Sequence, residues 1–99
     1  MGDAGGTVTV LVPAVLAQHT GDRRELTVQV PGTTTVAELL DVLARDYPIF
    51  GRRVRNEAGA IRRYVNCYLD GEDIRGLDGT GTRVQAGQQL LLIQSVAGG

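Results

Sequence analysis

The sequence contains no lysine and no tryptophan, and it has only one cysteine, one histidine and one methionine. A single cysteine, Cys67, excludes an internal disulfide and a multi-cysteine metal site, and His19 has no second histidine with which to bind a metal. The formal net charge of -1 argues against nucleic acid and anionic membranes as partners. No apolar run approaches the roughly 20 residues of a membrane span. The start, MGDAGG, lacks the charged and apolar regions of a signal peptide, which predicts a cytoplasmic location.

The length of 99 residues and the hydrophobic content of 42% allow one modest core, and they leave no room for a second domain with its own catalytic pocket. No internal repeat or linker is present. We interpret residues 1–6 as a flexible leader, residues 7–95 as the folded domain and residues 96–99 as a flexible tail.

Alternating valines and leucines predict strands over residues 7–12 and 25–30, joined as a hairpin by a long polar loop. After residue 35, the spacing of the apolar residues changes from every second residue, as in a strand, to a period of about 3.6 residues, as in a helix. Thr35 and Glu38 have the spacing of a capping box, and Pro48 closes the helix that follows. The apolar stripe of this helix is predicted to cover a sheet, and it consists of Val36, Leu39, Leu40, Leu43 and Tyr47.

The second half of the chain predicts a basic connection over residues 49–63, with room for a short helix, and then a strand over residues 64–69. Asp70–Gly71 is a tight-turn signal, and a short strand near Ile74 is expected after it. The run at 89–94 is apolar enough for a central strand. The order strand, strand, helix, connection, strand, short strand, strand predicts an α+β fold, with a mixed sheet and one main helix across it, as in a β-grasp.

The reactive-looking residues have structural interpretations. Cys67 alternates with apolar neighbours and is interpreted as a small buried side chain rather than a nucleophile, and His19 as a solvated loop residue. The Gly-rich stretch at 78–87 lacks the Gly-Lys-Ser/Thr ending of a phosphate-binding loop. A cluster of five arginines is interpreted as a solvated basic face for an acidic partner, namely Arg52, Arg53, Arg55, Arg62 and Arg63.

No catalytic set or metal site is therefore expected within the domain, and the ending SVAGG is the main chemical clue. Gly98 and Gly99 lack Cβ atoms, so that the walls of a channel can close tightly around them. Five extended residues reach roughly 17 Å. The pattern predicts that Val96 and Ala97 lie in a partner's tunnel and that the carboxylate of Gly99 is the working group. The alternative is a frayed terminus or a cloning scar.

From about Thr7 to Gly99 the chain resembles the ubiquitin-like sulfur carrier proteins, the MoaD/ThiS/CysO family, and most closely the CysO type. The motifs that carry the resemblance are Pro13-x-x-Leu16 with Thr20-Gly21, Tyr64-Val65-Asn66-x-Tyr68 with Glu72-Asp73-Ile74-Arg75, and Val96-Ala97-Gly98-Gly99. The sequence departs from the family pattern at two places, Gln88 after Gly87 and Gln94-Ser95 before the tail. These departures leave open which sulfur-accepting enzyme the chain would serve.

The resemblance implies that the chain is a carrier and not an enzyme. An E1-like adenylating enzyme would join the Gly99 carboxylate to AMP, and a sulfur donor would displace AMP to leave a thiocarboxylate. A sulfur-accepting biosynthetic enzyme, for cysteine, a thiolated cofactor or a natural product, is the implied second partner, and a tail-processing metalloprotease is a third. The chain itself would bind no cofactor, because ATP and any metal would belong to these enzymes.

Two other functions remain open from the sequence. A ubiquitin-like modifier would be conjugated through Gly99 to target lysines, although a chain without lysine cannot build side-chain-linked polymers on itself. A noncatalytic binding module would use its sheet to dock a partner, and its Gly-Gly ending would be incidental.

Overall fold

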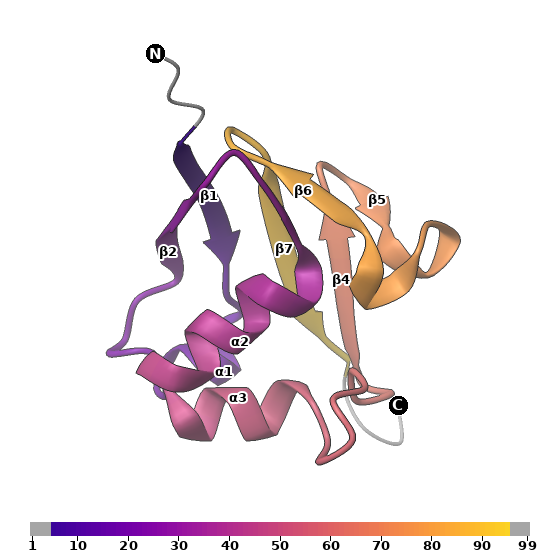
Figure 1. Cartoon of the computed structure of the whole chain (residues 1–99). Coiled ribbons are helices and arrows are strands. Elements are labelled where there is room, and N and C mark those ends of the chain that lie inside the picture. Colours follow the sequence, from indigo (N-terminus) through magenta and orange to yellow (C-terminus); the bar gives the residue numbers. More distant parts are fainter. Residues whose placement is uncertain (1–4, 96–99) are drawn as a thin grey trace.

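A computed structural model of the chain describes residues 5–95, and a mixed five-stranded sheet lies at its centre (Figure 1). The strand order is β2-β1-β7-β4-β5, and the two neighbours β1 and β7 run parallel. The strands are β1 (Gly6–Leu11), β2 (Glu25–Val30), β4 (Val65–Leu69), β5 (Glu72–Asp73) and β7 (Gln89–Gln94). The prediction that the last strand is central is confirmed.

The hairpin of β1 and β2 forms as predicted, because alternate valines of both strands face the helices. Val8 lies opposite Val28 in the antiparallel register, and both side chains are buried. The strand begins one residue earlier than predicted, at Gly6, while residues 1–4 of the predicted leader lie outside the described residues. The connection contains a short helix that the pattern did not predict, α1 (Ala14–Ala17).

Helix α2 (Val36–Asp46) is the predicted main helix, and it lies across one face of the sheet (Figure 1). The hydroxyl of Thr35 accepts a hydrogen bond from the backbone N–H of Glu38 at 3.1 Å, which is half of the predicted capping box. The other half is replaced, because the Glu38 carboxylate accepts from the Thr34 hydroxyl at 2.8 Å. Four residues of the predicted stripe are buried and Tyr47 packs at its edge.

Helix α3 (Pro48–Val54) occupies the basic connection and packs closely against α2. Proline at its start costs no hydrogen bond there. Gly51 faces Ala44, and a Cβ atom at Gly51 would lie only 2.6 Å from the Ala44 Cβ. The glycine therefore lets the two helices approach, and Phe50 is fully buried beneath them.

The segment after β4 begins with the predicted tight turn, since Asp70 and Gly71 both have positive φ, at 48° and 88°. The strand expected near Ile74 covers only Glu72–Asp73, and Ile74 instead begins a 3-10 helix, η1 (Ile74–Gly76). A second short 3-10 helix, η2 (Gly79–Gly81), follows.

A second sheet was not predicted. Strand β3 (Thr33–Thr35) pairs antiparallel with β6 (Arg83–Gln85) at the start of α2.

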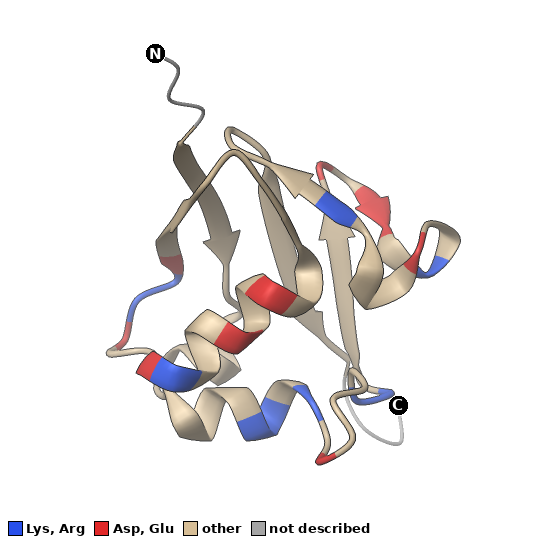
Figure 2. Ribbon diagram, viewed as in Figure 1, with Lys and Arg blue, Asp and Glu red and all other residues tan. Residues whose placement is uncertain are grey.

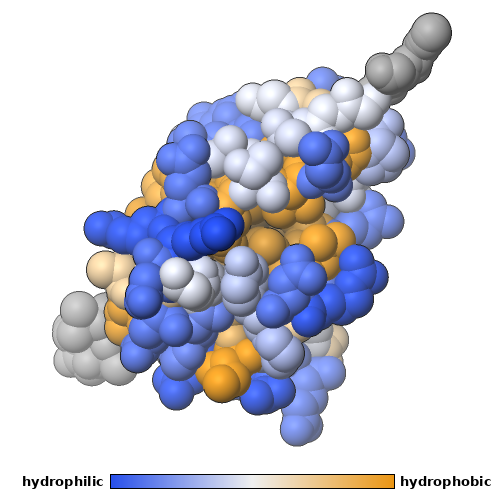
Figure 3. Space-filling view, turned by 90° about the vertical axis from the view of Figure 1, so that its left-hand side faces the viewer, coloured by the Kyte–Doolittle hydropathy of each residue, from blue (hydrophilic) through white to orange (hydrophobic). Residues whose placement is uncertain are grey.

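Figure 3 views the molecule from the side of β2, where hydrophobic areas at the surface are divided by hydrophilic side chains. No helix within residues 5–95 is long and apolar enough to cross a membrane.

Candidate functional site

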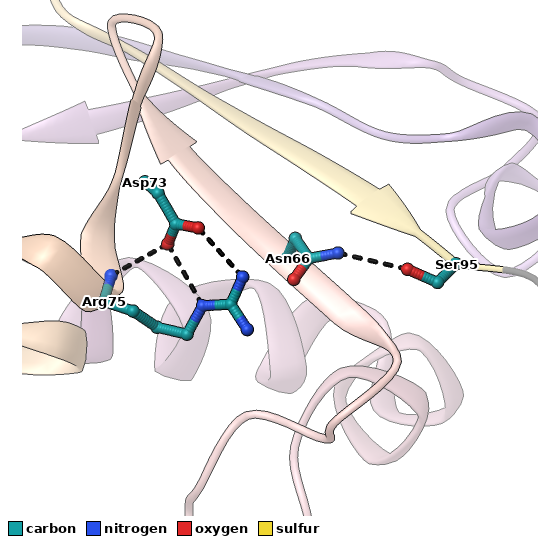
Figure 4. A network of polar contacts seen from close by, with 4 residues as sticks. All are labelled: Asn66, Asp73, Arg75 and Ser95. Carbon is teal, nitrogen blue, oxygen red and sulfur yellow. Dashed lines mark hydrogen bonds and ion pairs between the residues drawn. The ribbon is translucent and has the colours of Figure 1, made fainter.

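The sequence-predicted site residues Val96, Ala97, Gly98 and Gly99 lie outside the described residues, and the structure describes the point from which they extend. We call Gln94 and Ser95 the tail root. The backbone N–H of Ser95 donates to the carbonyl oxygen of Tyr64 at 2.7 Å. The side-chain amide of Asn66 donates to the Ser95 hydroxyl at 3.2 Å (Figure 4). The chain is therefore held against the start of β4 as far as Ser95.

The position of the tail root follows from the central strand of the sheet, which ends at Gln94. Strand β7 pairs with β1 on one side and with β4 on the other. Leu90 and Leu92 point into the core and are buried, whereas Leu91 and Ile93 alternate to the opposite face. Five residues on each strand form the register between β4 and β7, ending with Val65 opposite Gln94.

The sheet face opposite the helices presents apolar side chains beside the tail root. The exposed fraction of Ile93 is 41%, the largest among the hydrophobic residues of β7. A groove of about 480 Å³ runs over the carboxyl ends of the parallel strands β1 and β7, lined among others by Leu11, Leu91 and Ile93. Arg24 and Glu25 also line it. We call the surface of Leu11, Leu91 and Ile93 the open sheet face.

The five clustered arginines divide into two groups. Arg55 forms an ion pair with Asp41 at 2.7 Å, and the Arg62 side chain donates to the Arg52 carbonyl oxygen at 2.8 Å, so both hold the connection between α3 and β4. The side chains of the other three are exposed and form no ion pair within residues 5–95. We call these three the basic patch: Arg52, Arg53 and Arg63.

Arg53 of the basic patch adjoins the tail root. A small cleft of about 140 Å³ is lined by Arg53, Tyr64, Gln94 and Ser95. In Figure 2 the arginines of α3 lie at the same end of the molecule as the end of β7. An exposed arginine and an apolar surface therefore both adjoin the point where the tail begins, which suits a partner that combines acidic and apolar residues around a narrow opening.

Cys67 belongs to the core, as predicted. Its side chain is 2% exposed. Burial, with a smaller contribution from the negative charge of Asp73, raises the pKa of the Cys67 thiol to about 12. Because only the thiolate is a strong nucleophile, this thiol is unreactive at neutral pH.

An exposed ion pair follows the same strand. Asp73 accepts hydrogen bonds from the side chain and the backbone N–H of Arg75, which lowers the pKa of the Asp73 carboxyl (Figure 4).

His19 is half-buried in the turn after α1. Residues 5–95 contain no group of three or more His, Cys, Asp and Glu side chains placed to hold a metal ion.

Comparisons with known proteins agree with this architecture. Residues 10–99 match the ThiS family. The sulfur carrier protein CysO of Mycobacterium tuberculosis is 33% identical over 94 residues, which is 93% of this chain and 98% of that protein.

Two solved structures are similar over nearly their whole length. CysO in the crystal structure of the Amycolatopsis orientalis BexX/CysO complex has a TM-score of 0.78 and 32% identity, covering 93% of this chain and 99% of that one. Small archaeal modifier protein 1 of Haloferax volcanii has a TM-score of 0.78 and 28% identity, covering 92% and 99%. The fold is thus the ubiquitin-like β-grasp, and that prediction is confirmed.

Proposed function

The chain belongs to the ThiS family, and from this membership we propose that it is a sulfur carrier whose Gly99 carboxylate is adenylated and then converted to a thiocarboxylate. The observation that carries the proposal is that the family match extends through residue 99 and so includes the Gly-Gly ending. Its similarity to CysO over 93% of the chain supports the same role.

The proposed chemistry follows from the properties of a carboxylate. A free carboxylate is a poor electrophile, because neither oxygen is a good leaving group. An activating enzyme would transfer AMP from ATP to the carboxylate and release pyrophosphate. A sulfur donor would then attack the acyl carbon, the C–O bond to AMP would break, and the thiocarboxylate and AMP would remain. The chain supplies the acyl group and the docking surface, and the partner supplies the catalytic residues.

The structure supports a division of the chain into a body that docks and a tail that reacts. The open sheet face and Arg53 of the basic patch both adjoin the tail root, so that a partner touching both would contact the base of the tail. The four residues after Ser95 reach at most roughly 14 Å when extended. An activating enzyme and a sulfur-accepting enzyme would each bind this surface in turn.

The first prediction is the loading reaction itself. Incubation of the intact chain with a cognate activating enzyme, ATP and a sulfide source should replace one oxygen of Gly99 by sulfur, a gain of roughly 16 Da, by displacement on the activated acyl group. Intact mass spectrometry detects the gain, and peptide mapping should place it on the C-terminal peptide. No mass gain with an enzyme that loads other carriers of the family would contradict the proposal.

The second prediction separates Cys67 from the sulfur chemistry. Cys67→Ser should load sulfur as well as the wild type, because the thiol is buried and protonated. Its free energy of unfolding should fall by about 1–3 kcal/mol, since the serine hydroxyl would be buried in an apolar core without a hydrogen-bond partner. Urea titration measures the stability and mass spectrometry the loading. Loss of loading in the folded variant would show that Cys67 takes part in the sulfur chemistry.

A modifier function is the second candidate, and the similarity to small archaeal modifier protein 1 favours it. Both functions begin with the same adenylate and differ in the nucleophile that receives the acyl group. Adding a lysine-rich acceptor protein to the activation reaction separates them, because a modifier gives an isopeptide-linked product on a denaturing gel and a dedicated carrier gives only the thiocarboxylate.

A further inference from the structure

The contact between Asn66 and Ser95 joins the tail root to the open sheet face. Asn66 lies opposite Ile93 in the register between β4 and β7, so Ser95 is its diagonal neighbour on the same face. The side-chain amide of Asn66 reaches the Ser95 hydroxyl at 3.2 Å (Figure 4). Within residues 5–95, this is the one side-chain hydrogen bond that Ser95 makes.

This contact reinforces a single backbone bond. Strand pairing ends at Val65 and Gln94, and beyond it Ser95 is held by its N–H bond to the Tyr64 carbonyl oxygen at 2.7 Å. A terminal bond of a sheet frays easily, because no further pair protects it. The Asn66 amide adds a second attachment, from the same end of β4 but to the side chain of Ser95 rather than to its backbone, and two attachments restrict the orientation of this residue more than one does.

We propose that Asn66 is a positioning residue for activation of the terminus: it holds Ser95 so that the tail leaves in the direction that a partner docked on the open sheet face requires. This inference rests on the proposed function. If the contact is lost, the tail root samples more directions, and only a fraction of the docked encounters present the tail correctly. The apparent affinity of the activating enzyme for the chain then falls by that fraction, while the bound and activated chain reacts as before.

The test compares Asn66→Ala, Ser95→Ala and the double variant in pyrophosphate exchange with the activating enzyme and ATP. Each single variant should raise the KM for the chain about three- to tenfold, the range that one net hydrogen bond supports, with kcat unchanged. The double variant should show the same rise as either single variant, because both remove one contact. Asn66→Asp should keep most of the wild-type KM, since its carboxylate can accept a hydrogen bond from the Ser95 hydroxyl.

Gln89→Ala at the other end of β7 is the matched control, because this exposed residue is also on the central strand. It should leave KM unchanged. Urea titration should show a single cooperative unfolding transition for every variant, so that a change in KM does not reflect loss of the fold. An unchanged KM in Asn66→Ala, or single effects that multiply in the double variant, overturns the positioning role alone. A wild-type chain that supports no exchange overturns the proposed function and this inference with it.

Discussion

A chain lengthened by one residue after Gly99 should lose sulfur loading, while its folded domain keeps the stability of the wild type. The added residue moves the carboxylate by roughly 3.3–3.6 Å along an extended chain. A displacement of only about 1 Å can cost a hundredfold in rate, because the reacting atoms no longer meet in a productive geometry. We therefore expect at least about a hundredfold loss of loading, measured as the rate of the mass gain on the C-terminal peptide.

Gly98→Val should produce the same loss by a different physical route. A β-branched side chain restricts the backbone that glycine leaves free, and its added atoms need space in the channel around the tail. One extra residue before Met1 is the matched control, because it lengthens the chain equally and leaves the ending intact. Normal loading of the extended chain would show that Gly99 is not the working group, and the Gly-Gly ending would then be incidental. Normal loading of Gly98→Val would show that the channel does not require glycine at position 98.

Strong periodic patterns predicted the main elements of the fold. The hairpin of β1 and β2 follows from alternating valines, and α2 follows from a stripe of four buried apolar residues with Thr35 as its N-cap. The central position of β7 was predictable from its apolar run, although the strand is buried on one face only: Leu90 and Leu92 lie in the core, whereas Ile93 on the open sheet face remains 41% exposed.

The missed elements are short, and they depend on partners far along the chain. Each strand of the second sheet has three residues, and Thr34 pairs with Val84, fifty positions away. Such short segments carry no readable period. The prediction of a strand at Ile74 was wrong. The Asp73 side chain accepts a hydrogen bond from the Arg75 backbone N–H and thereby caps a 3-10 turn where a strand was expected.

The candidate site shows the same division between local and distant information. The small-residue ending pointed to Gly99 directly, and that assignment remains a prediction, since it lies outside residues 5–95. The sequence could not show that Arg55 pairs with Asp41 and so belongs to the scaffold, because Asp41 lies within α2 and Arg55 follows the end of α3, 14 positions later. It also could not show the contact between Asn66 and Ser95, which spans 29 positions. The motif Val-Asn-x-Tyr drew attention to Asn66, but only the register between β4 and β7 shows that this residue lies beside Ser95.

Reversing the charge of the basic patch should slow activation. Arg52 and Arg53 are exposed at the end of α3 and form no ion pair within residues 5–95, so their charges remain available to a partner. In Arg52→Glu/Arg53→Glu, attraction to an acidic partner becomes repulsion. We expect kcat/KM for adenylation to fall about tenfold at low salt, mainly through slower association, as is typical when exposed charges at the rim of an interface are changed.

The salt dependence distinguishes this mechanism from a loss of structure. Exposed charges are screened over about 8–10 Å at ordinary ionic strength, so the rates of the double variant and the wild type should converge as salt rises. Arg23→Glu/Arg45→Glu is the matched control, because it makes the same change in net charge at exposed residues near β2 and the end of α2. A tenfold effect from the control as well would indicate long-range steering by net charge. Wild-type rates at every salt concentration in Arg52→Glu/Arg53→Glu would place the docking surface away from α3, leaving the open sheet face as the contact around the tail root.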